Sequence, residues 1–308
     1  MKDNKVTIVV PVYADWRSLK VCIKSLKKHV DEKHKVILIN DCGPKPELMR
    51  KRIKKAIKGL DNFEYYRNAK NLGFVKTCNR AVLELDKTDN DVLLLNSDTE
   101  VTEGFLGEMQ FILKARSKVG TVSPRSNNAT ITTIPLSEAV NKGINPDKAY
   151  EIWLGIKDLL PRYNEVPVTH GFCMLIRRSL IQKYGLFDEV FGRGYGEEND
   201  FCLRIRKRGY KSVLANHAFV FHLEARSFTL PQKAKLLEQN NKIIYKRYPT
   251  YRQSVRNYMK KALVREAEAE KAAGIKVRAS VKSRLKNLLR KNKKVHRAAA
   301  KVHSKVHR

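Results

Sequence analysis

The feature that most constrains the fold is a series of short apolar runs that recur along the first hundred residues. They occupy residues 6–13, 36–39 and 92–95, and residues 63–66 (Phe-Glu-Tyr-Tyr) are a further expected strand, so the expected strands begin at intervals of roughly 30 residues. Continuous apolar runs of this length are typical of strands buried on both faces of a parallel sheet. Segments with apolar residues at helical spacing separate them. The alternation predicts βαβ units and an α/β fold with a mostly parallel central sheet flanked by helices.

Polar residues follow three of these expected strands directly. Asn40 and Asp41 come after the second strand, residues 68–71 after the third, and residues 96–98 after the fourth. In open parallel sheets, ligands bind at the carboxyl ends of the strands. The sequence therefore predicts a ligand site along this edge of the sheet.

The second half of the chain is less regular. Residues 127–165 are rich in Asn, Thr and Pro, which predicts loops with one short helix around residues 149–160. The later expected elements are a strand over 168–176, a glycine-rich loop over 192–196, a helix over 198–208, a strand over 212–221 and basic helices after Pro231. We expect a boundary near Phe228, with an α/β domain over residues 1–228 and a basic helical C-terminal extension over residues 229–308.

The net charge of +32 predicts a polyanionic partner such as a nucleotide, a nucleic acid, an anionic lipid or a phosphorylated substrate. The positive charge is densest in residues 256–308, which contain 18 Lys and Arg and three acidic residues. Every apolar run is shorter than the roughly 20 residues of a membrane-spanning helix. The N-terminus does not resemble a signal peptide, so the cytoplasm is the expected location. The five cysteines form no CxxC pair and are expected to be reduced and mostly buried.

Asp98 and Glu100 lie two residues apart and would share one face of an extended segment. Oxygen ligands of this kind suit Mg²⁺ or Mn²⁺, which in turn binds diphosphate. The alternative is a polar turn after a buried strand, and spacing alone gives the two interpretations equal weight. His222 could complete a Mn²⁺ shell, although a lone histidine at the end of an apolar strand is more often structural.

Glu197, Glu198 and Asp200 follow the glycine-rich loop at the start of a predicted helix. Like charges this close raise one another's pKa, which suits a general base. The alternative is that the helix dipole simply favours acidic residues in its first turn. Residues 71–74 with Asn79 form a second polar set, which could hold a phosphate on backbone N–H groups or be an ordinary glycine turn with a cap.

Taken in order, these segments resemble glycosyltransferase family 2, the inverting enzymes of GT-A fold, and especially its bacterial rhamnosyl- and galactofuranosyltransferase-like branch. The resemblance covers roughly residues 5–228. The matching stretches are residues 6–13, 39–43, 71–74 with Asn79, 95–98, 194–204, and His222 with Ser227 and Phe228. It implies a Rossmann-like GT-A domain that takes a nucleotide diphosphate sugar, UDP- or dTDP-linked, as donor.

The resemblance also implies residue roles on the donor side. The nucleotide-sugar site is expected to comprise Pro11, Val12, Tyr13, Asp41, Asn71, Gly73, Asn79, Asn96, Ser97 and Asp98. Asp41 takes the place of the nucleotide-binding carboxylate, and Cys42 stands where a glycine is usual. In the family's Asp-x-Asp motif Asn96 replaces the first aspartate. Asp98 and His222 are the expected ligands of a Mn²⁺ or Mg²⁺ cofactor.

On the acceptor side, the resemblance makes Glu198 the general base, with Glu197 and Asp200 as alternatives. His170, Gly171 and Glu197 are the expected acceptor-binding residues. The implied reaction is a single displacement in which a hydroxyl of a glycan or lipid-linked acceptor attacks and inverts the anomeric carbon. Cell-surface polysaccharide synthesis in a bacterium is the expected setting. The chain lacks the Gln-x-x-Arg-Trp signature of processive synthases.

Leu285, Leu288 and Leu289 lie among six Lys and Arg, which predicts a short basic amphipathic helix for an anionic membrane surface. Peripheral attachment to the inner face of the cell membrane is therefore a further expectation, with a solvated tail as its equal alternative. A different class of function is a nucleic-acid- or anionic-surface-binding protein without transferase activity. No nucleic-acid module is recognised, and the tail has no aromatic residue after Tyr258, so nucleic acid is the weaker partner. A third hypothesis is an inactive sugar-binding scaffold, against which the acidic and histidine motifs argue.

Overall fold

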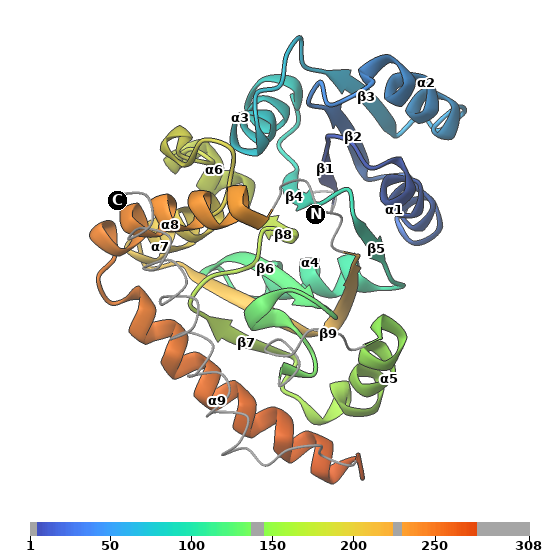
Figure 1. Ribbon diagram of the computed structural model, residues 1–308. Coiled ribbons are helices and arrows are strands. Elements are labelled where there is room, and N and C mark those ends of the chain that lie inside the picture. Colours follow the sequence, from blue (N-terminus) through green and yellow to red (C-terminus); the bar gives the residue numbers. More distant parts are fainter. Residues whose placement is uncertain (1–4, 137–144, 224–229, 276–308) are drawn as a thin grey trace.

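The computed structural model describes residues 5–136, 145–223 and 230–275. Within these residues nine strands form one sheet in the order β3-β2-β1-β4-β8-β6-β9-β5, and β7 pairs with β9 (Figure 1). The strands are β1 (Val6–Val12), β2 (Lys35–Asn40), β3 (Phe63–Arg67), β4 (Asp91–Leu95), β5 (Thr99–Val101), β6 (Val119–Arg125), β7 (Tyr163–Val166), β8 (Cys173–Ile176) and β9 (Lys211–His222). The helices are α1 (Trp16–His29), α2 (Pro46–Ala56), α3 (Phe74–Asn79), α4 (Phe105–Ala115), α5 (Pro146–Ile156), α6 (Arg178–Tyr184), α7 (Glu197–Arg206), α8 (Leu230–Arg247) and α9 (Tyr251–Ala272).

The N-terminal part of the sheet is parallel, as predicted. β3, β2, β1 and β4 pair side by side in the same direction, so their carboxyl ends meet at one edge. Helix α1 begins where the Asp15 carboxylate accepts hydrogen bonds from the backbone N–H groups of Arg17 and Ser18. Its buried face carries Leu19 and Leu26, which pack on the sheet.

The second part of the sheet is mixed, so the whole is less parallel than expected. β8 lies antiparallel between β4 and β6, and β6 runs parallel to β9. β9 is 12 residues long and also pairs antiparallel with β7 near its start and with β5 at its end. The predicted strand over 168–176 begins only at Cys173, and β7 lies in the stretch predicted to be loops. The predicted α/β class is confirmed.

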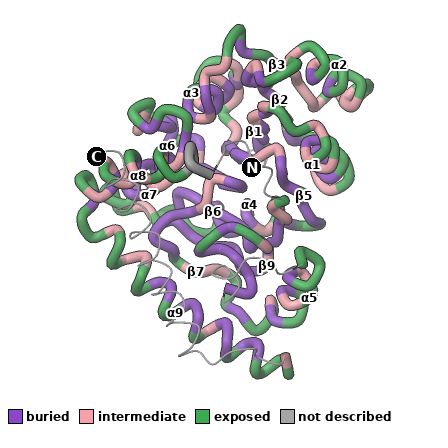
Figure 2. The backbone as a smooth tube through the Cα atoms, in the orientation of Figure 1, coloured by how far each residue is buried: buried purple, intermediate pink, exposed green. Residues whose placement is uncertain are grey.

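Two apolar cores lie on opposite faces of the sheet, because side chains alternate along each strand. On β1, Ile8 and Val10 belong to the core that α1 and α4 cover, whereas Val9 belongs to the core that α3, α7 and α9 cover. Figure 2 shows buried residues concentrated in the strands and the inner helix faces. The protein is therefore a three-layer α/β/α structure.

The C-terminal helices pack into this structure. α8 and α9 are helical as predicted, but Ile244, Tyr258 and Leu263 belong to the same core cluster as Val9 of the first strand. The predicted boundary near Phe228 lies outside the described residues, as does the amphipathic segment around Leu285. Among the residues described here, none of the helices has the length and apolar character needed to cross a membrane.

Candidate active site

Asn96, Ser97 and Asp98 form the turn between β4 and β5, at the edge where the parallel strands end. β5 pairs with the end of β9, which places Thr99 opposite His222. Asp98 is buried, and its Oδ1 lies 3.4 Å from His222 Nε2. The structure thus brings together the two residues that the sequence predicted as metal ligands.

The surrounding loop fixes both the backbone and the ring of His222. Its Nδ1 lies 2.7 Å from the backbone oxygen of Asn128, so an Nδ1–H donated to that oxygen leaves the Nε2 lone pair facing Asp98. The Asn127 amide pairs with the His222 backbone twice: its Oδ1 accepts from the His222 N–H at 2.8 Å, and its Nδ2 donates to the His222 carbonyl at 3.1 Å. The Phe172 ring stacks on the imidazole, with centroids 5.2 Å apart.

This donor set fits a small divalent cation that keeps substrate and water ligands. One carboxylate and one imidazole are few protein ligands, and Mg²⁺ sites in proteins commonly add substrate phosphates and waters to one or two carboxylates. Among residues 5–136, 145–223 and 230–275, no group of three or more His, Cys, Asp and Glu side chains is arranged to hold a metal. Glu100 is exposed on β5 and does not join Asp98.

Asp41 follows β2 and fixes the loop after β3. Its carboxylate accepts hydrogen bonds from Asn68 Nδ2 and from the backbone N–H groups of Leu72 and Gly73, all at 2.8–2.9 Å. The Asn71 side chain also accepts from the Gly73 N–H, at 3.0 Å. Gly73 has φ +81°, and a Cβ there would lie 3.2 Å from the Cα of Arg193. The loop is therefore held rigidly at the strand ends and packs on the glycine-rich loop.

Two residues predicted in the nucleotide-sugar site, Val12 and Asn79, direct their side chains to other parts of the protein. Val12 is 1% exposed and its side chain lies in the core, because it points to the opposite face of the strand from its half-buried neighbours Pro11 and Tyr13. Both polar atoms of the Asn79 side chain bind the backbone of Phe187. Nδ2 donates to the Phe187 carbonyl at 2.9 Å, and Oδ1 accepts from the Phe187 N–H at 3.1 Å. These two side chains anchor the sheet and α3.

Glu197 and Glu198 begin α7, directly after the glycine-rich loop. Glu197 is 5% exposed, and burial together with the charge of Glu198 holds its pKa well above the usual glutamate range. Burial also raises the pKa of Glu198, while backbone N–H groups, including that of Gly196 at 3.2 Å, oppose the rise. Glu198 thus has the elevated pKa that suits a general base.

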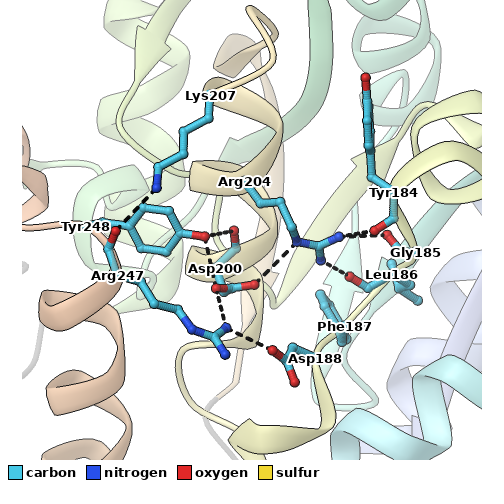
Figure 3. Close-up of a pocket in the computed structure, with 10 residues that line it drawn as sticks. All are labelled: Tyr184, Gly185, Leu186, Phe187, Asp188, Asp200, Arg204, Lys207, Arg247 and Tyr248. Atoms are coloured by element: carbon cyan, nitrogen blue, oxygen red, sulfur yellow. Dashed lines mark hydrogen bonds and ion pairs between the residues drawn. The ribbon is translucent and has the colours of Figure 1, made fainter.

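Asp200, the other candidate base, contacts three side chains. Its buried carboxylate binds Arg247 Nη1 at 2.8 Å, accepts from the Tyr248 hydroxyl at 3.0 Å and lies 3.4 Å from Arg204 Nε (Figure 3). Two guanidinium groups and one phenol therefore surround this carboxylate. Asp200 thus makes these three side-chain contacts in the structure, and its role as an alternative base stays a prediction.

His170 and Gly171 belong to the turn that lies between Glu198 and the Asp98–His222 pair. The Glu198 side chain lies 3.6–3.7 Å from the position a Cβ would take on Gly171. The next residue, Phe172, accepts a hydrogen bond from the Asn96 N–H at 2.8 Å and stacks on His222. His170 is fixed through its backbone by the Ser123 hydroxyl. Residues 170–172 therefore lie beside the predicted base on one side and the predicted metal pair on the other.

A model of glycosyl transferase family 2 matches residues 7–185. The chain belongs to this family. It is also 29% identical over 153 residues to the low-salt glycan biosynthesis hexosyltransferase Agl10 of Haloferax volcanii, a match that covers 48% of this chain and 47% of that protein. The chain thus spans about half the length of this curated relative.

Solved structures place the family 2 chain in the GT-A fold. One is GalNAc-T7 with UDP, GalNAc and Mn²⁺, with a TM-score of 0.58, 14% identity, and coverage of 79% of this chain and 48% of that one. Another is the mannosyltransferase PcManGT from Pyrobaculum calidifontis in complex with GDP-Man and Mn²⁺, with a TM-score of 0.56, 15% identity, and coverage of 94% of this chain and 79% of that one. At these identities the likeness concerns the fold.

Four residues that contact His222 or the glycine-rich loop in the candidate site were not singled out from the sequence: Asn127, Asn128, Phe172 and Asn240. The Asn127–Asn128 pair had a signal, since two adjacent asparagines in a loop favour side-chain hydrogen bonds to backbone. That signal does not say which backbone they meet. The contacts to His222 span 94 and 95 residues of sequence and follow from the pairing of β6 with β9, in which Arg125 lies opposite Phe219.

Proposed function

We propose that this chain is a metal-dependent, inverting glycosyltransferase that moves a sugar from a nucleoside diphosphate sugar to a hydroxyl of a glycan or lipid-linked acceptor. The observation that carries the proposal is the turn at residues 170–172, which lies beside Glu198 at Gly171 and contacts His222 and Asn96 through Phe172. The names of the relatives, a hexosyltransferase and enzymes bound to UDP or GDP-Man, support the donor class. Synthesis of bacterial cell-surface polysaccharide remains part of this proposal.

In the proposed step the Glu198 carboxylate accepts the proton of an acceptor hydroxyl. The oxygen forms a bond to the anomeric carbon as the bond from that carbon to the diphosphate oxygen breaks. The electron pair leaves with the nucleoside diphosphate, and attack from the opposite face inverts the carbon. Because burial raises the pKa of Glu198 above the ordinary glutamate value, it is a stronger base than an exposed carboxylate.

On the donor side, Asp98 and His222 Nε2 are the residues that would hold Mn²⁺ or Mg²⁺. A bound divalent ion would neutralise the charge that develops on the departing diphosphate. Pro11, Tyr13 and Asp41 lie at the ends of the neighbouring strands, where the nucleoside is proposed to bind.

The test is the release of nucleoside diphosphate from UDP-, dTDP- and GDP-linked sugars in the presence of Mn²⁺. We expect release with one of these donors, its loss with EDTA, and an inverted anomeric configuration in the NMR spectrum of the product. Glu198→Gln should lower turnover by about 10²–10⁴-fold while donor binding persists. Glu100→Gln is the matched control because Glu100 is exposed. Near-normal turnover of Glu198→Gln would overturn the assignment of the base.

The basic C-terminal tail supports a second element of the proposal, attachment to an anionic membrane where a lipid-linked acceptor resides. Residues 276–308 contain 13 Lys and Arg and no Asp or Glu. Each basic residue near an anionic surface contributes on the order of 1 kcal/mol. Full-length protein should sediment with vesicles of phosphatidylglycerol and phosphatidylcholine and stay in solution with phosphatidylcholine alone. Equal behaviour with both vesicles, or preferential binding to DNA or RNA, would refute membrane attachment.

A further inference from the structure

Asn240 of α8 holds the loop that carries the predicted base. Its side chain is buried, and the two N–H bonds of its Nδ2 are shared among the backbone carbonyls of Phe191, Gly194 and Tyr195 at 3.1, 2.8 and 2.9 Å. The Asn240 Cβ also lies 3.6 Å from the position a Cβ would take on Gly196. One amide group from a distant helix therefore gathers three carbonyls that precede Glu197.

The loop needs such support because of its backbone. Gly192, Gly194 and Gly196 have φ values of +58°, +123° and +114°, and Tyr195 between them has φ +72°. A non-glycine residue at positive φ is held in an unfavourable conformation, at a cost of order 1–3 kcal/mol when the surrounding structure imposes it. Without external hydrogen bonds the loop would relax and carry the start of α7 with it.

The corner between α8 and α9 grips the same turn of α7 at two further points. Arg247 and Tyr248 bind the carboxylate of Asp200, as Figure 3 shows. Tyr251 donates from its hydroxyl to Asn199 Oδ1 at 3.2 Å. Both contacts lie within three residues of Glu198. Asn240 therefore holds the loop before α7, and the corner between α8 and α9 holds the first turn of α7 itself.

We propose that Asn240 is a positioning residue of the transferase, which keeps Glu198 in place by fixing the backbone of residues 191–196. The proposal rests on the proposed function, in which Glu198 is the base. The role is positional because the three contacts of Asn240 are to backbone carbonyls three or more residues before Glu198. The matched family segment ends at residue 185, so Asn240 lies outside it.

Asn240→Ala should lower kcat by about 10- to 100-fold, since displacement of a catalytic group by roughly 1 Å can cost about 10²-fold. The KM for the donor should change little, because the loss falls on the chemical step. Asn240→Asp, of the same size, should lose at least as much because its oxygens face three carbonyl oxygens. Gln239→Ala is the matched control: the neighbouring side chain is exposed on the same helix.

Two further measurements separate positioning from general damage. Mn²⁺ affinity, followed by electron paramagnetic resonance, should be unchanged in Asn240→Ala, and the variant should melt cooperatively. Hydrogen–deuterium exchange should increase in residues 191–200 relative to wild type and Gln239→Ala, and remain unchanged in β1 and β4.

The outcomes distinguish this inference from the proposed function. If wild-type protein transfers no sugar, the proposed function fails. Hydrogen exchange over residues 191–200 then tests by itself whether Asn240 fixes the loop. If wild type is active, an Asn240→Ala variant with normal kcat would overturn the inference. Unchanged exchange over residues 191–200 would overturn it as well, whatever the activity.

Discussion

Replacing Glu197 tests whether burial beside Glu198 raises the pKa of this side chain and makes the stability of the protein depend on pH. The side chain is 5% exposed, and its Oε2 has no hydrogen-bond partner among the described residues. Burial and the neighbouring Glu198 charge both disfavour ionisation, so the pKa of Glu197 lies well above its usual range. Glu197→Gln keeps the shape of the side chain and removes the proton equilibrium. The pH dependence of its stability therefore isolates the effect of the raised pKa.

The sign follows from proton linkage. Because the folded-state pKa is raised, the unfolded chain loses this proton first as the pH increases. The stability that neutral Glu197 contributes is complete below the unfolded pKa of about 4.3 and declines until the pH passes the folded value. The decline has a limiting slope of about 1.4 kcal/mol per pH unit for one proton. Glu197→Gln should therefore gain stability relative to wild type as the pH rises, at up to this slope.

Denaturant unfolding of both proteins between about pH 5 and about pH 8 measures the difference. Thermal scans should show the same trend, since about 1 kcal/mol corresponds to roughly 2–4 °C in large domains. Glu100→Gln is the control, because it makes the same chemical change at an exposed position. Parallel stability curves for wild type and Glu197→Gln would refute the reasoning.

Two further predictions concern residues that shape the site. Asn127→Ala should weaken Mn²⁺ binding by about 10- to 100-fold, because its amide fixes the His222 backbone; a Mn²⁺ titration checks this, and Asn128→Ala should have no effect since only the Asn128 backbone meets His222. Gly43→Ala should destabilise the protein by more than about 1 kcal/mol in denaturant unfolding, since its Cβ would lie 1.8 Å from the Tyr13 carbonyl oxygen. Gly107→Ala, in an open helical position, should instead be neutral or stabilising by up to about 1 kcal/mol.

The parallel half of the fold could be predicted because β1, β2 and β4 are buried apolar runs and helical patterns separate its four strands. The mixed half could not. β5 has three residues and β7 has four, so neither provides enough alternation to predict a strand. β8 is apolar in either orientation, and only its tertiary neighbours, β4 and β6, decide that it runs antiparallel.

In the candidate site, too, the sequence predicts local features but not the partners that distant parts of the chain supply. Asp98 and His222 could be predicted from strand ends and the family resemblance, and their side chains do meet. Asn79 and Asp200 have the same local character, a polar residue beside a glycine-containing loop. Their partners, Phe187 and Arg247, lie 108 and 47 residues away in the sequence, so nothing local distinguishes a ligand-facing amide or carboxylate from a structural one.

The C-terminal helices pack against the α/β domain, and each contacts a loop that borders the candidate site. α8 holds the glycine-rich loop through Asn240. α9 holds the loop after β6 that contacts His222: Glu266 accepts from the Leu136 N–H and forms a buried pair with Arg125, at 3.4 Å. Breaking such a buried pair typically costs about 3–5 kcal/mol because one charge is left uncompensated. Over its described residues, the segment predicted as a basic extension therefore packs against the loops that border the candidate base and the candidate metal pair.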